Sequence, residues 1–472
     1  MSELKHDLTA RLESFLSRAL PEFRTLTSLE RLTGGASQET YALEIDTSGG
    51  VRRLALRREA GGQPMAHTAG QVGLANEARV LRAAHAARVP VPEILATLGP
   101  EEGLGEGFLM PWLSGETLGS KIVRDPVLTA LQPSLAYQCG QVLARIHGMD
   151  IARHALEDCL TVTPPAALVE QTYARYRALD TPQPMIDYTA RWLLANLPCA
   201  PRQTVVHGDF RNGNLMVSPA GIVAVLDWEI AHCGDPMRDL GWLCTHSWRF
   251  GRAEKPVGGF GEYAELFAGY TAESGLAVDP THVRFWEIFG SFWWAVGCLS
   301  MADQYRHGPD RTVERPAIGR RSSECQVDCV NFLIPGDVTQ VDATAAPDTA
   351  LPSTLELLAS VREFLRGDLA QALPERAQYL ARVAANSLEI IRRELLHGDA
   401  ARAAERARLA TLLGTSAPLA ELRWDLVRRL RAGDFALDDA GLTAHLRMTV
   451  VNEVLIDQPR YAGAETALVT PC

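Results

Sequence analysis

The sequence lacks a cysteine framework. Nine cysteines are scattered over 472 residues, and only Cys325 and Cys329 lie close together. The CxxxC spacing puts this pair on one face of a helix, but no second pair completes a metal site. An odd number of cysteines without disulfide-type spacing predicts reduced thiols and, with them, a cytoplasmic protein.

The sequence also lacks a membrane-spanning run and an excess of basic residues. Its most apolar stretch, FWEIFGSFWWAVGCLSM (285–301), contains Glu287 and is too short to cross a bilayer, so we expect a buried helix. The N-terminal MSELKHDLTA is charged and has no signal-peptide core. A net charge of −11 argues against nucleic-acid binding, although it leaves room for a local basic pocket. We therefore expect neither a membrane nor a nucleic acid as a partner.

What is present indicates more than one domain. Alternating apolar and polar residues predict short strands before about residue 111, and helical spacing dominates later. Residues 335–352, PGDVTQVDATAAPDTALP, have no apolar period and are typical of a linker. Beyond them the segments are amphipathic at helical spacing, so we expect residues 353–472 to form a separate helical domain.

The most informative stretch is VVHGDFRNGNLMV (205–217), which VAVLDWE follows. Asp209 stands five residues before Asn214, and Asp227 stands thirteen residues after it. Phosphoryl transfer requires a carboxylate that orients the attacking hydroxyl and oxygen ligands that hold Mg²⁺ on the nucleotide phosphates. A loop with Asp-x4-Asn and a hairpin that delivers a second Asp supplies these groups. We therefore predict that Asp209 is the catalytic base and that Asn214 and Asp227 bind Mg²⁺.

Two neighbours of Asp209 have supporting roles in this interpretation. Arg211 is a second catalytic residue, which neutralises charge on the transferred phosphoryl group. His207 is expected to order the loop by hydrogen bonds and not to act as the base. The alternative is an ordinary Asx-rich turn, which the complete pattern at kinase spacing makes the weaker interpretation.

The combined motif, continued as VLDWEIAHCGDPMRDLGWL, resembles the aminoglycoside phosphotransferase superfamily. The resemblance covers about residues 15–330. It implies an α+β, protein-kinase-like fold with a β-rich N-lobe (about 1–111) and a mainly helical C-lobe (about 112–334). It also implies ATP and Mg²⁺ as cofactors and an alcohol as the acceptor, and hence an ATP-dependent phosphotransferase.

The same resemblance implies residues that contact the nucleotide. LTGGASQETY is similar to the family's nucleotide loop, in which Gly34 and Gly35 allow close backbone approach to phosphates and Ser37 adds a hydroxyl. The hinge that meets adenine corresponds to FLMPW. Because its proline has no N–H, we expect Met110 or Trp112 to supply the donor.

The family also has a cation on its third strand that pairs with a glutamate on a helix. Here LALRRE offers Arg57 for that position, and NEARVL offers Glu77. Arg58 is the alternative to Arg57. An arginine holds phosphate as a planar fork and not as a point charge, which departs from the common lysine.

On the acceptor side the candidates are Asp239 and Trp242, both in GDPMRDLGWL. Asp239 could instead belong to a helix N-terminus, where acids are favoured. The tryptophans, Trp242 included, could instead be core residues. Asp235 is expected in a structural turn.

HGDFRxxNLM, GDPxxDLGWL and ALRR look like the branch of the superfamily that is associated with acyl-CoA dehydrogenases. The C-terminal helices resemble a small helical protein that accompanies these kinases. This resemblance implies phosphorylation of a hydroxyacyl-CoA, such as a 4-hydroxyacyl-CoA. The arginines of 392–408 and 319–321 are then candidates for the CoA 3′-phosphate, with solvated surface arginines as the alternative.

Three other functional readings stay open. The chain could be an aminoglycoside or other small-alcohol kinase, or a pseudokinase that binds nucleotide as a scaffold.

The helical domain is expected to contribute to acyl-CoA binding or to closing the acceptor site. Its alternative role is to form a homodimer.

Overall fold

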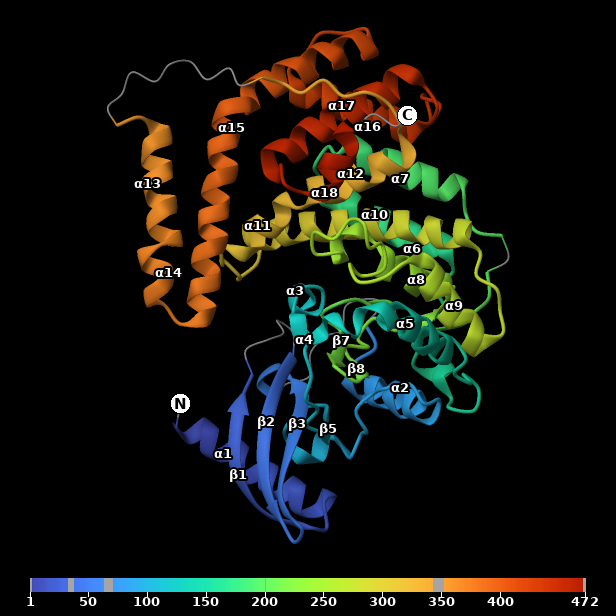
Figure 1. Cartoon of the computed structure of the whole chain (residues 1–472), viewed down its shortest axis with the longest axis vertical. Helices are drawn as coiled ribbons and strands as arrows, with labels where there is room; N and C mark the ends of the chain where they lie inside the picture. The colour runs from blue at the N-terminus through green and yellow to red at the C-terminus, as the bar shows by residue number, and fades with distance from the viewer. Residues whose placement is uncertain (1, 33–37, 63–70, 200, 343–351, 470–472) are drawn as a thin grey trace.

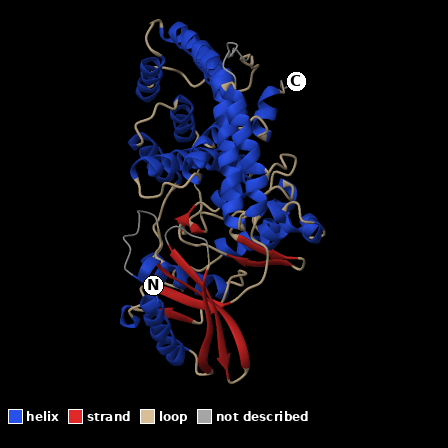
Figure 2. Cartoon of the chain, turned by 90° about the vertical axis from the view of Figure 1, so that its left-hand side faces the viewer, coloured by secondary structure: helices blue, strands red, loops and turns tan. Residues whose placement is uncertain are grey.

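The computed structural model describes residues 2–32, 38–62, 71–199, 201–342 and 352–469. Figure 1 shows a sheet-containing part at one end of the molecule, a mainly helical part in the middle and a second group of helices at the other end. The same arrangement is seen in Figure 2, where the strands gather at one end and helices fill the rest.

The N-terminal part is an antiparallel sheet in the order β1-β2-β3-β5-β4. Its strands are β1 (Phe23–Arg31), β2 (Gln38–Thr47), β3 (Gly50–Glu59), β4 (Ala96–Leu98) and β5 (Gly107–Pro111). Helix α1 (Ser2–Ala19) shares a core with one face of this sheet, where Leu12 and Leu16 join Leu54 and Leu56 of β3. Side chains alternate between the two faces of a strand, so Arg57 lies on the face opposite to α1. Helix α2 (Leu74–Ala86) packs beside β5 and carries Glu77.

The middle part is built around two helices that cross closely. A Cβ on Gly140 of α5 (Gln132–His147) would lie 2.1 Å from the carbonyl oxygen of Leu266 in α9 (Tyr263–Ser274), so only glycine permits this approach. The other helices of this part are α3 (Gly119–Ile122), α4 (Pro126–Thr129), α6 (Pro165–Ala178), α7 (Pro184–Ala195), α8 (Met237–Cys244), α10 (Pro280–His307), α11 (Glu314–Arg320) and α12 (Ser322–Leu333). Its short strands are β6 (Thr204–Val206), which pairs with β9 (His232–Gly234), and β7 (Leu215–Ser218), which pairs with β8 (Gly221–Val225).

Helix α10 contains the most apolar stretch of the sequence and is the buried helix that was predicted. Its Glu287 is 1% exposed and is neutralised by Arg249 at 2.6 Å, with a hydrogen bond of 2.9 Å from the Tyr263 hydroxyl. Across the described part of the chain, no helix combines the length and the apolar character that a membrane crossing needs.

The C-terminal helices are α13 (Thr354–Arg366), α14 (Asp368–Ala372), α15 (Glu375–Leu413), α16 (Leu419–Ala432), α17 (Ala440–Asp457) and α18 (Ala462–Leu468). The end of α15 and helices α16 to α18 share a core with the middle part. One cluster of buried side chains joins Tyr188 of α7 and Val330 of α12 to Leu426 of α16 and Val451 of α17. The hairpin of α13, α14 and the first half of α15 stands apart from this core (Figure 1). The described residues between α12 and α13 form no helix or strand.

Candidate active site

The loop between β6 and β7 fixes the carboxylate of Asp209. Its Oδ1 accepts hydrogen bonds from Arg211 Nε (2.9 Å) and Trp242 Nε1 (2.7 Å), and its Oδ2 accepts one from Asn214 Nδ2 (2.6 Å). The side chain is 15% exposed. A carboxylate offers about four lone pairs, so three donors leave one acceptor position on Oδ2. Asp209 is therefore rigidly oriented and still able to accept one more proton donor.

Asp239 holds this loop from inside the protein. Its two carboxylate oxygens accept the backbone N–H groups of His207 and Gly208, each at 2.8 Å, and its Oδ2 lies 3.1 Å from His147 Nε2. Burial raises the pKa of Asp239, but His147, His207 and Arg238 together outweigh it and bring the pKa to about 2. The side chain is fully buried, so Asp239 positions the catalytic loop and does not form the acceptor wall that was one expectation.

His207 makes the ordering contacts expected of it. Its Nδ1 accepts the N–H of Asp209 at 3.1 Å, so its Nε2 carries the proton and donates to the carbonyl of Leu226 at 3.1 Å. Burial lowers the pKa of His207, which keeps the ring neutral. A neutral ring with both nitrogens occupied does not serve as the base.

Trp242 is a core residue that also contacts the site. It is 1% exposed and packs edge-on against Trp248 and Trp293, with ring centroids 5.0 and 5.2 Å away. Its indole N–H nevertheless donates a hydrogen bond to Asp209. The Arg211 guanidinium lies over the Trp248 ring at 4.4 Å. The sequence holds one signal for this role, because Asp239 and Trp242 are three residues apart and so face the loop from the same side of α8.

The two adjacent arginines of β3 have different partners. Arg57 contacts Glu77 at 3.2 Å and Asp227 at 2.7 Å, whereas Arg58 pairs with Glu39 at 2.8 Å on the other face of the strand. Burial raises the pKa of Glu77 to about 7, against the opposing effect of Arg57. Arg57 is therefore the cation that connects the sheet to the helix glutamate and to the predicted metal ligand.

The predicted Mg²⁺ ligands are joined by the backbone. The N–H of Leu226 donates to the carbonyl of Asn214 at 2.8 Å, and Asp227 follows with a left-handed φ of 64°. Asn214 spends its Nδ2 on Asp209, which leaves its Oδ1 as the group for a cation. Within the described ranges no cluster of three or more His, Cys, Asp or Glu suits a metal ion. Mg²⁺ on a nucleotide needs only one or two carboxylates beside phosphate oxygens, so these residues fit it.

One of the two expected hinge donors, the N–H of Trp112, is already bonded within the sheet. The N–H of Trp112 donates to the carbonyl of Arg53 in β3 at 3.1 Å, so it is not available to adenine. Met110 lies opposite Ala55 in the same pairing. Backbone groups alternate between the two edges of an extended strand, so the next N–H that points away from β3 is that of Leu113. The pairing with β3 therefore decides which edge of this segment is open to a ligand.

The predicted phosphate-contacting residues Gly34, Gly35 and Ser37 lie outside the described residues. The strand that follows them begins at Gln38, whose side-chain Oε1 accepts a hydrogen bond from Arg57 Nε. The end of the loop at residue 38 therefore reaches the same face of the sheet as Arg57.

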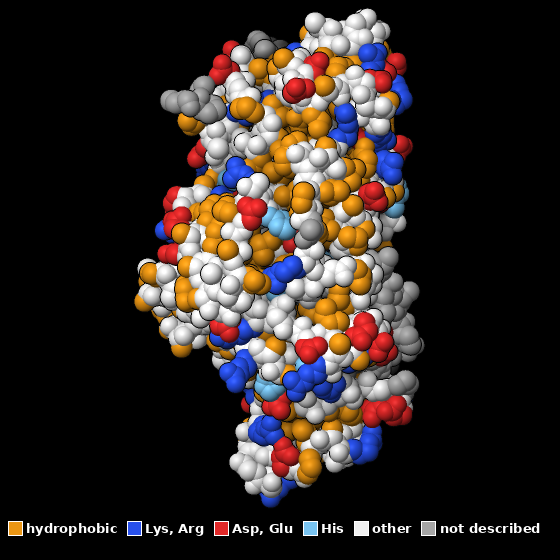
Figure 3. Space-filling view, turned by 90° about the vertical axis from the view of Figure 1, so that its right-hand side faces the viewer, with side chains coloured by type: hydrophobic (Ala, Val, Ile, Leu, Met, Phe, Trp, Pro, Cys, Tyr) orange, Lys and Arg blue, Asp and Glu red, His pale blue; other side chains and the backbone are white. Residues whose placement is uncertain are grey.

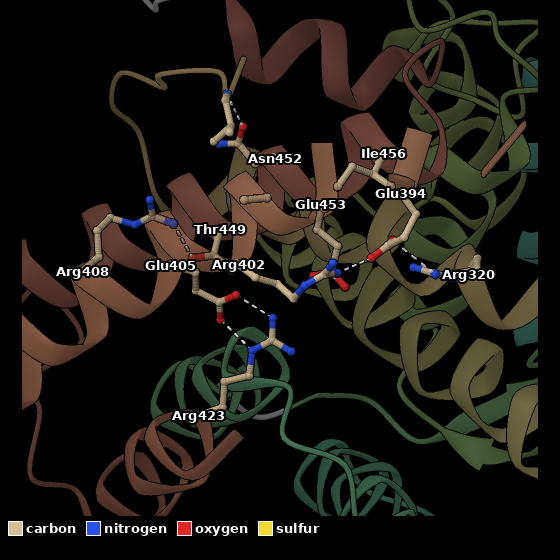
Figure 4. A pocket seen from close by; sticks show the side chains of 13 residues that line it. Arg320, Glu394, Arg402, Glu405, Arg408, Arg423, Thr449, Asn452, Glu453 and Ile456 are labelled. Atoms are coloured by element: carbon tan, nitrogen blue, oxygen red, sulfur yellow. Dashed lines mark hydrogen bonds and ion pairs between the residues drawn. The ribbon is translucent and has the colours of Figure 1, made fainter. Parts of the chain in front are cut away.

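A cavity of about 170 Å³ lies among the C-terminal helices (Figure 4). Its arginines are mostly neutralised. Arg423 forms a two-pronged pair with Glu405, and Arg320 contacts Asp457 at 3.0 Å. Arg408 differs, since its partner is the hydroxyl of Thr449 at 3.1 Å. Paired arginines of this kind stabilise the helices and give little support to a CoA 3′-phosphate site here.

Comparison with known proteins agrees with this geometry. Residues 28–276, which are 249 of the 472 residues, match the model of the phosphotransferase enzyme family. Residues 371–461 match a domain of unknown function, DUF6285. A solved structure of a candidate aminoglycoside phosphotransferase from Ralstonia eutropha is 23% identical with a TM-score of 0.55, and covers 67% of this chain and 95% of that one. The expected kinase-like α+β fold is thus confirmed.

Two relatives are much longer than the matched region. Acyl-CoA dehydrogenase family member 10 of Mus musculus is 34% identical over 44% of this chain and 19% of that protein. Acyl-CoA dehydrogenase family member 11 of Gallus gallus is 30% identical over 49% of this chain and 30% of that protein. The chain thus spans less than a third of the length of these relatives. The family model covers both the strand with Arg57 and the loop with Asp209, and the chain belongs to the phosphotransferase enzyme family.

Proposed function

We propose that this protein is a kinase that transfers the γ-phosphoryl group of ATP to a hydroxyl group of a small molecule. The observation that carries the proposal is the carboxylate of Asp209, which three donors orient and which keeps one acceptor position on Oδ2. The acceptor hydroxyl gives its proton to this oxygen while its own oxygen bonds to the γ-phosphorus. The bond from that phosphorus to the bridging oxygen breaks, and ADP leaves.

The nucleotide side uses Arg57 as a phosphate clamp. The guanidinium of Arg57 contacts both Glu77 and Asp227. Glu77 can keep it in place while the N–H groups that now face Asp227 turn to a phosphate oxygen. Asn214 and Asp227 then hold Mg²⁺, which neutralises charge on the phosphates. Gly34, Gly35 and Ser37 are proposed to cover the phosphates, and Leu113 to meet adenine with Met110 and Trp112 beside it.

Arg211 is proposed to act on the transferred group. Its guanidinium is held by Asp209 and by the ring of Trp248, which places a cation next to the base. During transfer the negative charge moves to the equatorial oxygens, and a fixed cation stabilises that charge without reorganising.

We propose a hydroxyacyl-CoA, such as a 4-hydroxyacyl-CoA, as the acceptor. The support comes from relatives named as acyl-CoA dehydrogenase family members and from the second matched domain in the same chain. An aminoglycoside kinase is the alternative, favoured by the fold of the Ralstonia protein alone. A pseudokinase scaffold is disfavoured, because Asp209, Asn214 and Asp227 are all present at one site.

The C-terminal helices are proposed to support the acceptor side. They share a core with α7 and α12, which makes them part of the same folded body as the helical lobe. A homodimer is the competing role. It is supported by apolar side chains that α13 leaves half exposed, namely Leu357, Val361 and Phe364. Light scattering of Leu357→Asp beside the unchanged chain tests it, since a dimer through α13 would dissociate.

The function is tested by incubating the protein with Mg·ATP and a panel of hydroxyacyl-CoAs, free hydroxy acids and aminoglycosides. Mass spectrometry then detects an acceptor that has gained a phosphoryl group. Asp209→Asn is the control, because it keeps the shape of the side chain but cannot take up the proton. Phosphorylation that persists at the same rate in this variant contradicts the proposed role of Asp209.

A further inference from the structure

A cavity of about 520 Å³ lies between α6, β9, α8 and α10. Helices α6, α8 and α10 lie next to one another in the middle of Figure 1. The volume is in the range of small-molecule sites. Its wall includes the cations Arg175 and Arg238, the imidazole of His232, and the apolar Leu168, Ile230 and Trp293. None of the described residues that line it is Asp or Glu.

Arg238 is an unusual buried cation. It is 2% exposed, and its Nε is buried without a hydrogen-bond partner. Of the other buried arginines in the described ranges, Arg249 pairs with Glu287 at 2.6 Å and Arg58 with Glu39 at 2.8 Å. Arg447 donates to two backbone carbonyls, each at 2.8 Å. Within the described residues Arg238 forms neither an ion pair nor a hydrogen bond, and the rings of Trp242 and Phe289 lie 5.4 Å from its guanidinium carbon. A buried cation without a bonded partner is costly for folding. Burial dominates and lowers the pKa of Arg238, although Asp239 and Asp209 favour its charged form, so a bound anion would stabilise it.

Arg175 adds a second positive charge on the same cavity. It lies on α6 with its guanidinium carbon 5.4 Å from the centre of the Trp293 ring. No carboxylate contact of Arg175 is found in the described part of the chain. Two arginines on different helices therefore line the same cavity.

His232 is a neutral residue in the wall of this cavity. Its Nδ1 lies 3.1 Å from the carbonyl of Ile230, and a carbonyl only accepts, so Nδ1 carries the proton. The Nε2 atom then carries an acceptor lone pair and is buried without a hydrogen-bond partner. Burial, together with the nearby Arg238, lowers the pKa of His232 to about 4, so the ring stays neutral at physiological pH.

The cavity wall adjoins the catalytic loop. A Cβ on Gly208 would lie 2.7 Å from the carbonyl oxygen of Ile230, so the residue before Asp209 packs directly on the wall. On the other side, Trp293 packs on Trp242, whose N–H is bonded to Asp209. The wall of the cavity is therefore in contact with residues that hold the proposed base.

We infer that this cavity binds an oxyanion of the phosphoryl acceptor, a carboxylate or a phosphate, between Arg175 and Arg238. The inference rests on the proposed function and names the class of its substrate, an alcohol that also carries negative charge. Two unpaired arginines attract such a molecule and repel a polycation. The neutral His232 accepts a hydrogen bond from the polar part of the same ligand.

The test compares acceptors that differ in charge. The series is 4-hydroxybutyrate, 4-hydroxybutyryl-CoA, the neutral 1,4-butanediol and the polycation kanamycin. We expect the anionic acceptors to have a KM at least about tenfold below that of the diol, since a charge-assisted hydrogen bond contributes roughly 1.5–3 kcal/mol. A diol or kanamycin used as well as the anions overturns the inference while leaving the kinase activity in place.

Variants locate the effect. Arg175→Gln is expected to raise the KM for the anionic acceptor about tenfold and to leave the KM for Mg·ATP and for the diol unchanged. Arg238→Gln should do the same, with thermal unfolding as the check on its fold. Arg177→Gln is the matched control, because this arginine lies on the same helix but contacts the Tyr173 ring at 4.9 Å. Equal KM values in Arg175→Gln and Arg177→Gln would overturn the inference.

The two sources of the oxyanion are separated by free coenzyme A. Inhibition by coenzyme A that competes with the acceptor and is weakened in Arg175→Gln identifies a phosphate. A lower KM for 4-hydroxybutyrate than for its CoA ester identifies a carboxylate. If nothing is phosphorylated, the proposed function fails. The cavity is then judged by calorimetric binding of 4-hydroxybutyryl-CoA, and equal affinity in the unchanged chain and Arg175→Gln overturns the inference.

Discussion

The indole N–H of Trp242 donates a hydrogen bond of 2.7 Å to Oδ1 of Asp209. This bond joins a fully buried aromatic core to the carboxylate proposed as the base. It occupies the oxygen that Arg211 also contacts, and so directs the remaining acceptor capacity of Asp209 to Oδ2. The core of the helical lobe thereby fixes which oxygen faces the acceptor.

Replacing Trp242 by Phe should therefore lower kcat and leave the KM for Mg·ATP unchanged. The ring keeps most of its packing, but Asp209 loses one donor, which corresponds to a fall of about tenfold in kcat. Trp294→Phe is the matched control, because the N–H of Trp294 is buried without a hydrogen-bond partner. Equal losses in both variants would mean that packing alone is responsible.

Asp209→Asn and Asp227→Asn should fail in different steps. The amide of the Asp209→Asn variant cannot take up the proton, and its own NH₂ group would face the NH₂ group of Asn214. Turnover is therefore lost while Mg·ATP still binds. At 227 the loss of the carboxylate weakens Mg²⁺-dependent nucleotide binding. Single-turnover rates and nucleotide titrations separate the two effects. Near-normal turnover of Asp209→Asn would contradict the assignment of the base.

Arg57→Lys should raise the KM for Mg·ATP, and Arg57→Ala should raise it further. An ammonium cannot span Glu77 and Asp227 as the guanidinium fork does, and we expect an increase of about tenfold or more. Arg58→Ala should instead lower the unfolding temperature, because it removes the buried cation from Glu39 and leaves it only Arg31 and the Tyr41 hydroxyl. A large rise in KM for Arg58→Ala with a silent Arg57→Ala would reverse the assignment.

Asp239→Asn should destabilise the protein and slow turnover together. An amide has one oxygen to offer the two N–H groups that Asp239 accepts, and an unsatisfied buried donor costs about 1–3 kcal/mol. The pKa of Asp239 is about 2, below its ordinary value of 3.8, so its stabilisation is complete above the ordinary value and is lost as pH falls. The difference in unfolding free energy between the two proteins should therefore shrink as pH falls from about 4 to about 2. A difference that stays constant over this range would contradict the charge-based explanation.

Ending the chain after residue 340 should lower the unfolding temperature of what remains. The cut exposes Met185, Tyr188 and Val330, which the C-terminal helices now cover. Each buried apolar side chain contributes about 1.5–3 kcal/mol, so several kcal/mol are lost. Calorimetry of both chains measures this, with Mg·ATP binding as the check on the remaining site. An unchanged unfolding temperature would indicate that the C-terminal helices fold independently.

The sequence by itself determined which residues meet at the candidate site. Asp209, Asn214 and Asp227 stand at a spacing that needs only a loop and a hairpin to bring them together, and local turn geometry supplies both. The alternation in β3 and the helical period of the later segments likewise predicted the order of a sheet and two helical parts, because these periods follow from burying one face of each element.

The remaining decisions depended on contacts between distant segments. Whether Arg57 or Arg58 meets Glu77 depends on the face of β3 that α1 covers, and a shift of one residue exchanges the faces. Whether Trp112 can donate to adenine depends on its pairing with Arg53 of another strand. Asp239 and Trp242 acquired their roles only when α8 packed under the catalytic loop, since sequence spacing does not say what lies on the other side of a helix face. The missing hydrogen-bond partner of Arg238 Nε likewise became evident only in the fold, because it depends on all the segments that pack around this side chain.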